Sequence, residues 1–129
     1  MRDPSLQIHS VAMNPNHPQY PERERISKSL DRRISDLFLK RLKTGWDIPA
    51  LKALADSDNI SAPLVFKIRL FDMKGDGEET NLPADILQLL EDFHAVCCKM
   101  DERWKQLVIT MNIAPDRKSF RLQWDYSYP

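Results

Sequence analysis

An alternation of apolar and polar residues in the last quarter of the chain constrains the fold most. Apolar side chains stand at every second position of two runs, Leu107 to Ile113 and Phe120 to Tyr128. This period of two is typical of β-strands with one buried and one solvated face. Between the runs, Pro115 and Asp116 have the chemistry of a tight turn. The pattern predicts a β-hairpin, which needs apolar cover from the rest of the chain because an isolated hairpin is only marginally stable.

Two segments have the spacing of amphipathic helices and are predicted to supply that cover. The first spans residues 21–43 and is followed by Gly45, where a left-handed C-terminal cap is favoured. The second spans residues 83–101 and starts at Pro83, which suits the first turn of a helix. Trp124 and Leu122 of the hairpin are predicted to be buried against both helices, on the side chains of Leu37, Phe38, Leu90 and Phe93.

Two further segments lie between the helices. Residues 64–70 alternate apolar and charged side chains and predict a strand. Residues 46–55 are open to two interpretations: a short helix with Asp47 as its N-cap, or a strand led by Trp46.

The order of these features resembles a known family. A Gly-Trp pair follows a first helix, a Pro-started helix comes next, and a Trp opens an apolar strand that continues through a Pro-Asp turn into an aromatic strand ending in Asp-Tyr. This pattern, over roughly residues 22 to 128, is similar to that of the YezG-like immunity proteins of bacterial polymorphic, contact-dependent toxin systems. The resemblance implies a strand at 46–55.

The predicted fold is therefore of the α+β class: an antiparallel sheet covered on one face by two helices, in the order helix-strand-strand-helix-strand-strand. We expect residues 1–20 to form a flexible Pro-rich leader and residues 21–129 to form a single domain.

Charge and cysteine content exclude several classes of protein. The chain has 19 basic and 19 acidic residues, so no net field draws it to nucleic acid or to a membrane. Its only cysteines, Cys97 and Cys98, are adjacent, which is not a disulfide framework and fits a reducing compartment. No apolar run is long enough to span a bilayer. The expected location is the cytoplasm.

Candidate sites for chemistry are few. Asp72, Asp76 and Gly77 match three positions of a calcium-binding loop, but Lys74 and Pro83 stand where two ligands belong. His94 and Cys98 have the spacing of two metal ligands on a helix, whereas zinc needs three or four. We therefore expect no catalytic, metal or cofactor site and no enzyme activity.

The resemblance implies an immunity protein that binds a cognate toxin domain and occludes its active or substrate-binding surface. A loop and a helix face rich in carboxylates are the predicted partner-binding surface, since an acidic edge suits a basic toxin site. The alternative is a small nucleic-acid-binding regulator that uses the basic residues of the first helix and of the hairpin, Arg117, Lys118 and Arg121. The sequence leaves the oligomeric state open. The predicted partner-binding residues are Asp72, Asp76, Glu78, Glu79, Asp85, Glu91 and Asp92.

Overall fold

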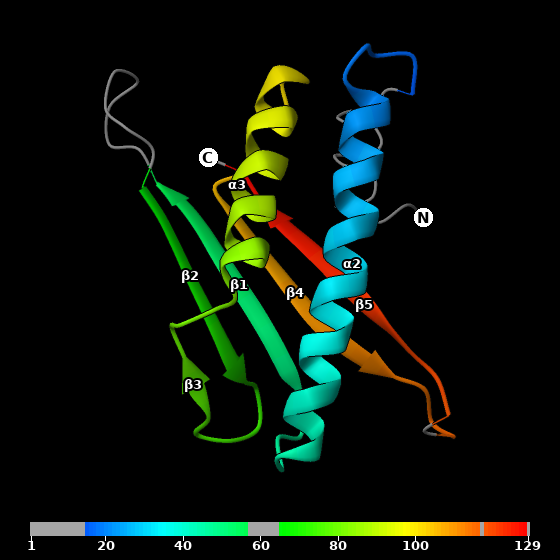
Figure 1. Cartoon of the computed structure of the whole chain (residues 1–129), viewed down its shortest axis with the longest axis vertical. Helices are drawn as coiled ribbons and strands as arrows, with labels where there is room; N and C mark the ends of the chain where they lie inside the picture. The colour runs from blue at the N-terminus through cyan, green and yellow to red at the C-terminus, as the bar shows by residue number, and fades with distance from the viewer. Residues whose placement is uncertain (1–14, 57–64, 117, 129) are drawn as a thin grey trace.

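Two helices form from the two segments with helical periodicity. In the computed structural model, which describes residues 15–56, 65–116 and 118–128, helix α2 spans Tyr20–Lys43 and helix α3 spans Ala84–Lys99 (Figure 1). Gly45 ends the first helical segment with a φ of 103°, a conformation that side chains other than glycine rarely adopt. Both helices are confirmed close to their predicted bounds. The predicted leader lies mostly outside the described residues, and α2 begins at its last residue.

Within the described residues, five strands form one antiparallel sheet, and the predicted α+β class is confirmed. Their order across the sheet is β3-β2-β1-β4-β5, so β1 is central and pairs with β2 and with β4. Residues 46–55 form a strand, as the resemblance implied, but the strand starts at Pro49 rather than at Trp46, and the helical interpretation is wrong. The strands are β1 Pro49–Asp56, β2 Val65–Asp72, β3 Glu78–Glu79, β4 Gln106–Ile113 and β5 Phe120–Ser127.

The predicted order of elements lacks β3. This strand has only two residues, Glu78 and Glu79, which pair with Phe71 and Leu70 of β2. The Asp72 N–H donates to the carbonyl of Gly77 at 2.9 Å and closes the turn that brings the two strands together. Two adjacent glutamates carry no alternation of apolar and polar residues, so the sequence shows only an exposed loop here.

Both helices cover the same face of the sheet (Figure 1). Side chains from four strands alternate onto this face, and the centre of it is fully buried. The core between the two helices and the sheet contains the fully buried side chains of Leu30, Ile34, Phe38, Leu51, Ala53, Leu70, Leu90, Phe93, Leu107 and Ile109.

The predicted hairpin is present, but its second strand lies at the margin of the core. Trp124 and Leu122 are only half-buried, which corrects the expectation that they are core residues. The reason is that β5 is an edge strand, beyond the part of the sheet that the helices cover completely. Trp104, which precedes β4, is 1% exposed and fills the core instead.

Among the described residues, no helix has the length and apolar character needed to cross a bilayer.

Candidate functional site

Asp72 is a structural residue rather than part of an exposed acidic surface. It is buried, and its carboxylate accepts hydrogen bonds from the backbone N–H groups of Asp47, Ile48 and Lys74 at 2.9–3.0 Å. The backbone N–H groups of Ile48 and Asp47 lower the pKa of this carboxyl from its ordinary value, because they stabilise the ionised form. Asp72 therefore joins the start of β1 to the end of β2, and it is buried rather than exposed beside the other predicted partner-binding residues.

Three of the other predicted acidic residues are paired with arginines of this chain. Glu79 lies 2.7 Å from Arg41 of α2, and Glu78 lies 3.6 Å from Arg69 of β2. Asp85 at the start of α3 pairs with Arg33 of α2. These arginines offset much of the negative field that the sequence alone suggests.

The remaining three acidic residues, Asp76, Glu91 and Asp92, are exposed. Asp92 accepts a hydrogen bond from the Gln88 amide at 3.0 Å, on the side of α3 that carries Asp85 two helical turns earlier. Glu91 instead lines a groove beside β2, and Asp76 lies in the turn before β3. The structure thus does not bring the seven predicted residues into one continuous surface.

The histidine and the cysteines of α3 lie in a packed environment. His94 Nε2 donates to the carbonyl oxygen of Trp104 at 3.1 Å, and the two rings meet edge to face at 4.5 Å. Burial lowers the pKa of His94, since the charged form is poorly solvated there. Within the described ranges, no three side chains of the His, Cys, Asp and Glu types come together as ligands for a metal ion.

Cys97 is expected to be unreactive in the folded protein. Burial raises the pKa of its thiol to about 12, so at pH 8 only about one molecule in ten thousand carries the nucleophilic thiolate. In a Cys98→Ser variant, which leaves Cys97 as the single thiol, labelling by a disulfide reagent at pH 8 should be slow until guanidinium unfolds the chain. Labelling of the folded variant at the rate of a small free thiol would contradict the buried position of Cys97.

A buried ion pair joins the first helix to the connection between α3 and β4. Arg23 and Glu102 are 2% and 1% exposed, and two parallel hydrogen bonds of 2.9 and 3.0 Å link guanidinium and carboxylate. The guanidinium also lies over the ring of Phe93, 5.1 Å from its centroid. This bidentate geometry is the one in which a buried charge is best compensated. The pair is surrounded by protein and offers no opening to a ligand among the described residues.

A large groove lined by both apolar and polar side chains lies at the end of the molecule where α2 stops and the β4–β5 hairpin turns. We call it the hairpin-end groove; its volume is about 890 Å³. Leu39 and Ile113, which line it, are 38% and 40% exposed, and they are two of the three large hydrophobic residues described as exposed. The third, Met73, is 56% exposed and donates its N–H to the carbonyl of Ile48, another lining residue. The lining residues are Leu39, Leu42, Trp46, Asp47, Ile48, Lys74, Met111, Asn112, Ile113, Ala114, Pro115, Lys118, Ser119 and Phe120.

Trp46 is held firmly in the wall of this groove. A Cβ atom on Gly77 would come within 2.6 Å of the Trp46 ring, so only glycine permits this close approach. The guanidinium of Arg41 also lies over the ring, 5.8 Å from its centroid. The groove therefore has a preformed aromatic wall.

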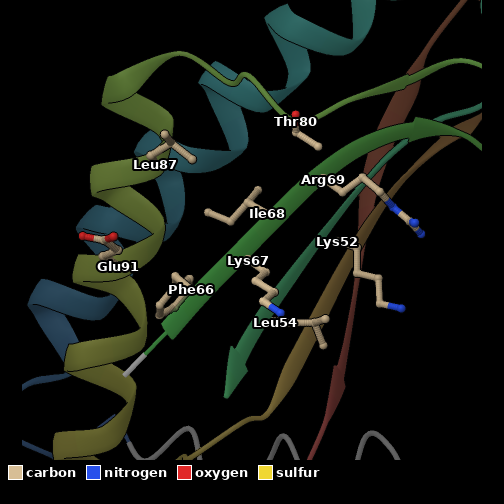
Figure 2. Close-up of a pocket in the computed structure, with 9 residues that line it drawn as sticks. All are labelled: Lys52, Leu54, Phe66, Lys67, Ile68, Arg69, Thr80, Leu87 and Glu91. Atoms are coloured by element: carbon tan, nitrogen blue, oxygen red, sulfur yellow. The ribbon is translucent and has the colours of Figure 1, made fainter. Parts of the chain in front are cut away.

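A second groove, of about 560 Å³, follows strand β2 (Figure 2). We call it the edge groove. Its apolar part includes Leu87 of α3 and Ile68 of β2, and Lys52, Lys67 and Arg69 lie on the other side of the strand (Figure 2). The complete lining consists of Lys52, Leu54, Phe66, Lys67, Ile68, Arg69, Thr80, Leu87 and Glu91.

Part of the surface predicted for the nucleic-acid-binding alternative pairs with carboxylates of this chain. Four arginines of α2 contact carboxylates of this chain: Arg23, Arg25, Arg33 and Arg41. On the hairpin, Lys118 and Arg121 are exposed, whereas Arg117 lies outside the described residues. The hairpin aromatics pack toward the core and are not free to stack on bases.

Neither groove was predicted from the sequence. Each is assembled from three or more segments that are distant along the chain, so no local motif marks it. One signal was available: Leu39 lies outside the apolar stripe of α2, and Met73 lies in a charged loop, so both are apolar residues at positions where polar ones are expected. Comparison of the chain with protein-family models, with curated proteins and with solved structures finds no match.

Proposed function

We propose that this protein is an immunity protein, which binds a cognate toxin domain in the cytoplasm and neutralises it by covering its active or substrate-binding surface. The function is stoichiometric binding without a chemical step. Its first support is the resemblance described above, whose elements the fold contains: Trp104 before β4, the β4–β5 hairpin, α3 after Pro83 and the Gly45-Trp46 pair after α2.

The observation that carries the proposal is the hairpin-end groove. Large exposed hydrophobic residues cost solvation free energy, and when they gather in one place they mark a surface that a protein partner covers. In the described part of the chain, the three large hydrophobic residues that are exposed lie in or next to this groove: Leu39, Met73 and Ile113. Partly buried aromatic side chains, Trp46 and Phe120, form its walls and suit the role of binding hot spots.

Charged residues at the rim indicate the kind of contact expected. Lys74 and Lys118 line the hairpin-end groove and are exposed, and Asp47 is the single acidic lining residue. A partner loop with an apolar tip and flanking carboxylates would fill the apolar centre and pair with the lysines. The proposed contact surface is thus the hairpin-end groove, and the acidic residues beside β3 are the rival surface.

The test is co-expression in a bacterial host. The C-terminal domain encoded by the gene immediately upstream is expressed with and without this chain. The expected result is growth arrest by the domain alone, restored growth when both are present, and a complex of defined stoichiometry on purification. Continued arrest in the presence of folded, soluble protein overturns the proposal.

Variants of the groove then locate the contact surface. Replacing Leu39 with glutamate, or Ile113 with glutamate, should weaken the complex by at least about tenfold, since each places a charge in the apolar centre of the interface. Because both positions are exposed, the thermal midpoint of each variant should stay close to that of the parent protein. Dissociation constants measured by titration calorimetry provide the comparison.

The matched control reverses two residues of the rival surface, Asp76 and Glu78, to lysine. Glu79 is left in place because its partner Arg41 packs against Trp46 in the wall of the groove. If the acidic residues steer the toxin, the double variant associates markedly more slowly at low salt. Under the groove assignment its affinity stays within a fewfold of the parent value. Strong loss in the double variant with unchanged binding in the groove variants would move the interface to the acidic residues.

A further inference from the structure

Strand β2 has one side without a paired strand along much of its length. Strand β3 pairs with β2 only at Leu70 and Phe71. Over Phe66 to Arg69, no described strand pairs with β2 on the side away from β1. The edge groove runs along this same segment (Figure 2).

The backbone of this segment points its hydrogen-bonding groups into the groove. The N–H of Asp72 points toward β3, since it donates to Gly77, whereas the N–H of Met73 points toward β1 and donates to Ile48. Successive residues of a strand direct their N–H and C=O groups to opposite sides. Counting back from Asp72 by twos, the backbone groups of Ile68 and Phe66 therefore face away from β1, toward the open edge.

The side chains of this segment differ in chemistry between the two faces of the sheet. Lys67 and Arg69 pair across the sheet with Leu54 and Lys52, so these four share the face that the helices leave uncovered. Phe66 and Ile68 lie on the opposite face, and Leu87 of α3 adjoins them in the groove (Figure 2). An approaching strand would meet cations on one of its faces and apolar side chains on the other.

The charge at this edge is mainly positive. Three cations, Lys52, Lys67 and Arg69, line the edge groove together with one carboxylate, Glu91. Because Arg69 also lies 3.6 Å from Glu78 of β3, the charge offered to a ligand comes mainly from Lys52 and Lys67. The Nε of Arg69 is shielded from solvent and has no hydrogen-bond partner among the described residues. Lysine on an edge strand often discourages pairing with other chains. Here the same charges would favour an added strand whose carboxylates lie on the same face of the sheet as these cations.

We propose that the edge groove binds an extended protein segment in which acidic and apolar residues alternate. The segment adds to the sheet beside β2 and exchanges backbone hydrogen bonds with Phe66 and Ile68. Its acidic side chains face Lys67, Arg69 and Lys52, and its apolar side chains enter the groove beside Ile68 and Leu87. This binding does not require the partner to be a toxin, and it uses residues outside the hairpin-end groove.

The probe is a short fluorescein-labelled synthetic peptide in which valine and glutamate alternate, added to the full-length protein. Fluorescence anisotropy should show saturable binding, and the amide protons of Phe66 and Ile68 should become protected from hydrogen exchange. Two control peptides are needed: one with lysine in place of glutamate, and one with the backbone nitrogens of alternate residues methylated. Both controls should bind at least about tenfold more weakly. Equal binding of the methylated peptide would overturn strand addition.

Charge reversal in the protein completes the test. A double variant, Lys52→Glu with Lys67→Glu, should lose at least about tenfold in affinity for the glutamate peptide and should gain affinity for the lysine peptide. Unchanged preference for the glutamate peptide would overturn the assignment. Tighter binding of a single-stranded oligonucleotide that displaces the peptide would also overturn it, in favour of a nucleic-acid site. Neither outcome bears on neutralisation by the hairpin-end groove, which the co-expression experiment measures separately.

Discussion

Replacing Glu102 with glutamine is expected to lower the free energy of unfolding by about 3–5 kcal/mol, which corresponds to a fall of roughly 10–20 °C in the thermal midpoint. The substitution keeps the size of the side chain and removes its charge. Arg23, which is 2% exposed, then stays buried without the carboxylate that compensates it. Chemical denaturation and calorimetry of the purified variant measure the loss.

Two further variants separate charge from packing. The double replacement Arg23→Met with Glu102→Leu removes both charges and should regain much of the lost stability, because buried ion pairs are often replaceable by apolar residues of similar volume. Glu22→Gln breaks the exposed pair with Arg25 on the same helix and should leave the midpoint nearly unchanged. If Glu102→Gln is as stable as the parent protein, the ion pair is solvated and the position of Glu102 in the core is wrong.

Trp104→Ala should also lower the free energy of unfolding by about 3–5 kcal/mol, the usual cost of deleting a large aromatic side chain from a core. The Trp104 ring contacts four aromatic rings edge to face or tilted, those of Phe66, His94, Phe93 and Tyr126, with centroids 4.5–6.4 Å away. The surrounding rings come from β2, α3 and β5, so the cavity cannot close by the movement of a single loop.

Trp124→Ala is the matched control, since it removes the same type of side chain from β5, which pairs with the strand that follows Trp104. Its ring meets Phe93 at 5.6 Å but is only half-buried, so its loss should cost about half as much as that of Trp104. Denaturant titration of the two variants in parallel gives the comparison. A larger effect at Trp124 would restore it as the central aromatic residue of the core.

The secondary structure was predicted well wherever a single side-chain period runs through a whole element. The stripe from Ile26 to Leu42 sets the bounds of α2, and the alternation from Leu107 to Met111 identifies β4 and its buried face. The burial of Trp104 was not predicted from the sequence, because this residue stands two positions before β4 and belongs to no alternating run. Its burial depends on how the connection from α3 turns, beginning with Asp101 at a φ of 60°, and this turn has no local sequence signal.

The candidate sites were predicted less well, because they depend on contacts between distant residues. From the sequence alone, Glu78, Glu79 and Asp85 are expected to be unpaired carboxylates. In the fold, each forms an ion pair with an arginine of another helix or strand. The residues directly before and after Glu102 are charged, so the local sequence does not indicate that Glu102 is buried. Its partner Arg23 sits on a helix rich in exposed charges, so the one arginine that turns inward is not distinguishable from the others by composition.

The link between Arg23 and Glu102 also has a consequence for how the protein is made. The two residues are 79 positions apart, so α2 leaves the ribosome long before its charge partner has been synthesised. Until then the helix can neither neutralise Arg23 nor bury its apolar stripe beneath a complete sheet. Domains generally fold as units once their distant contacts are available. The nascent chain therefore cannot form its complete core until its last quarter has emerged from the ribosome.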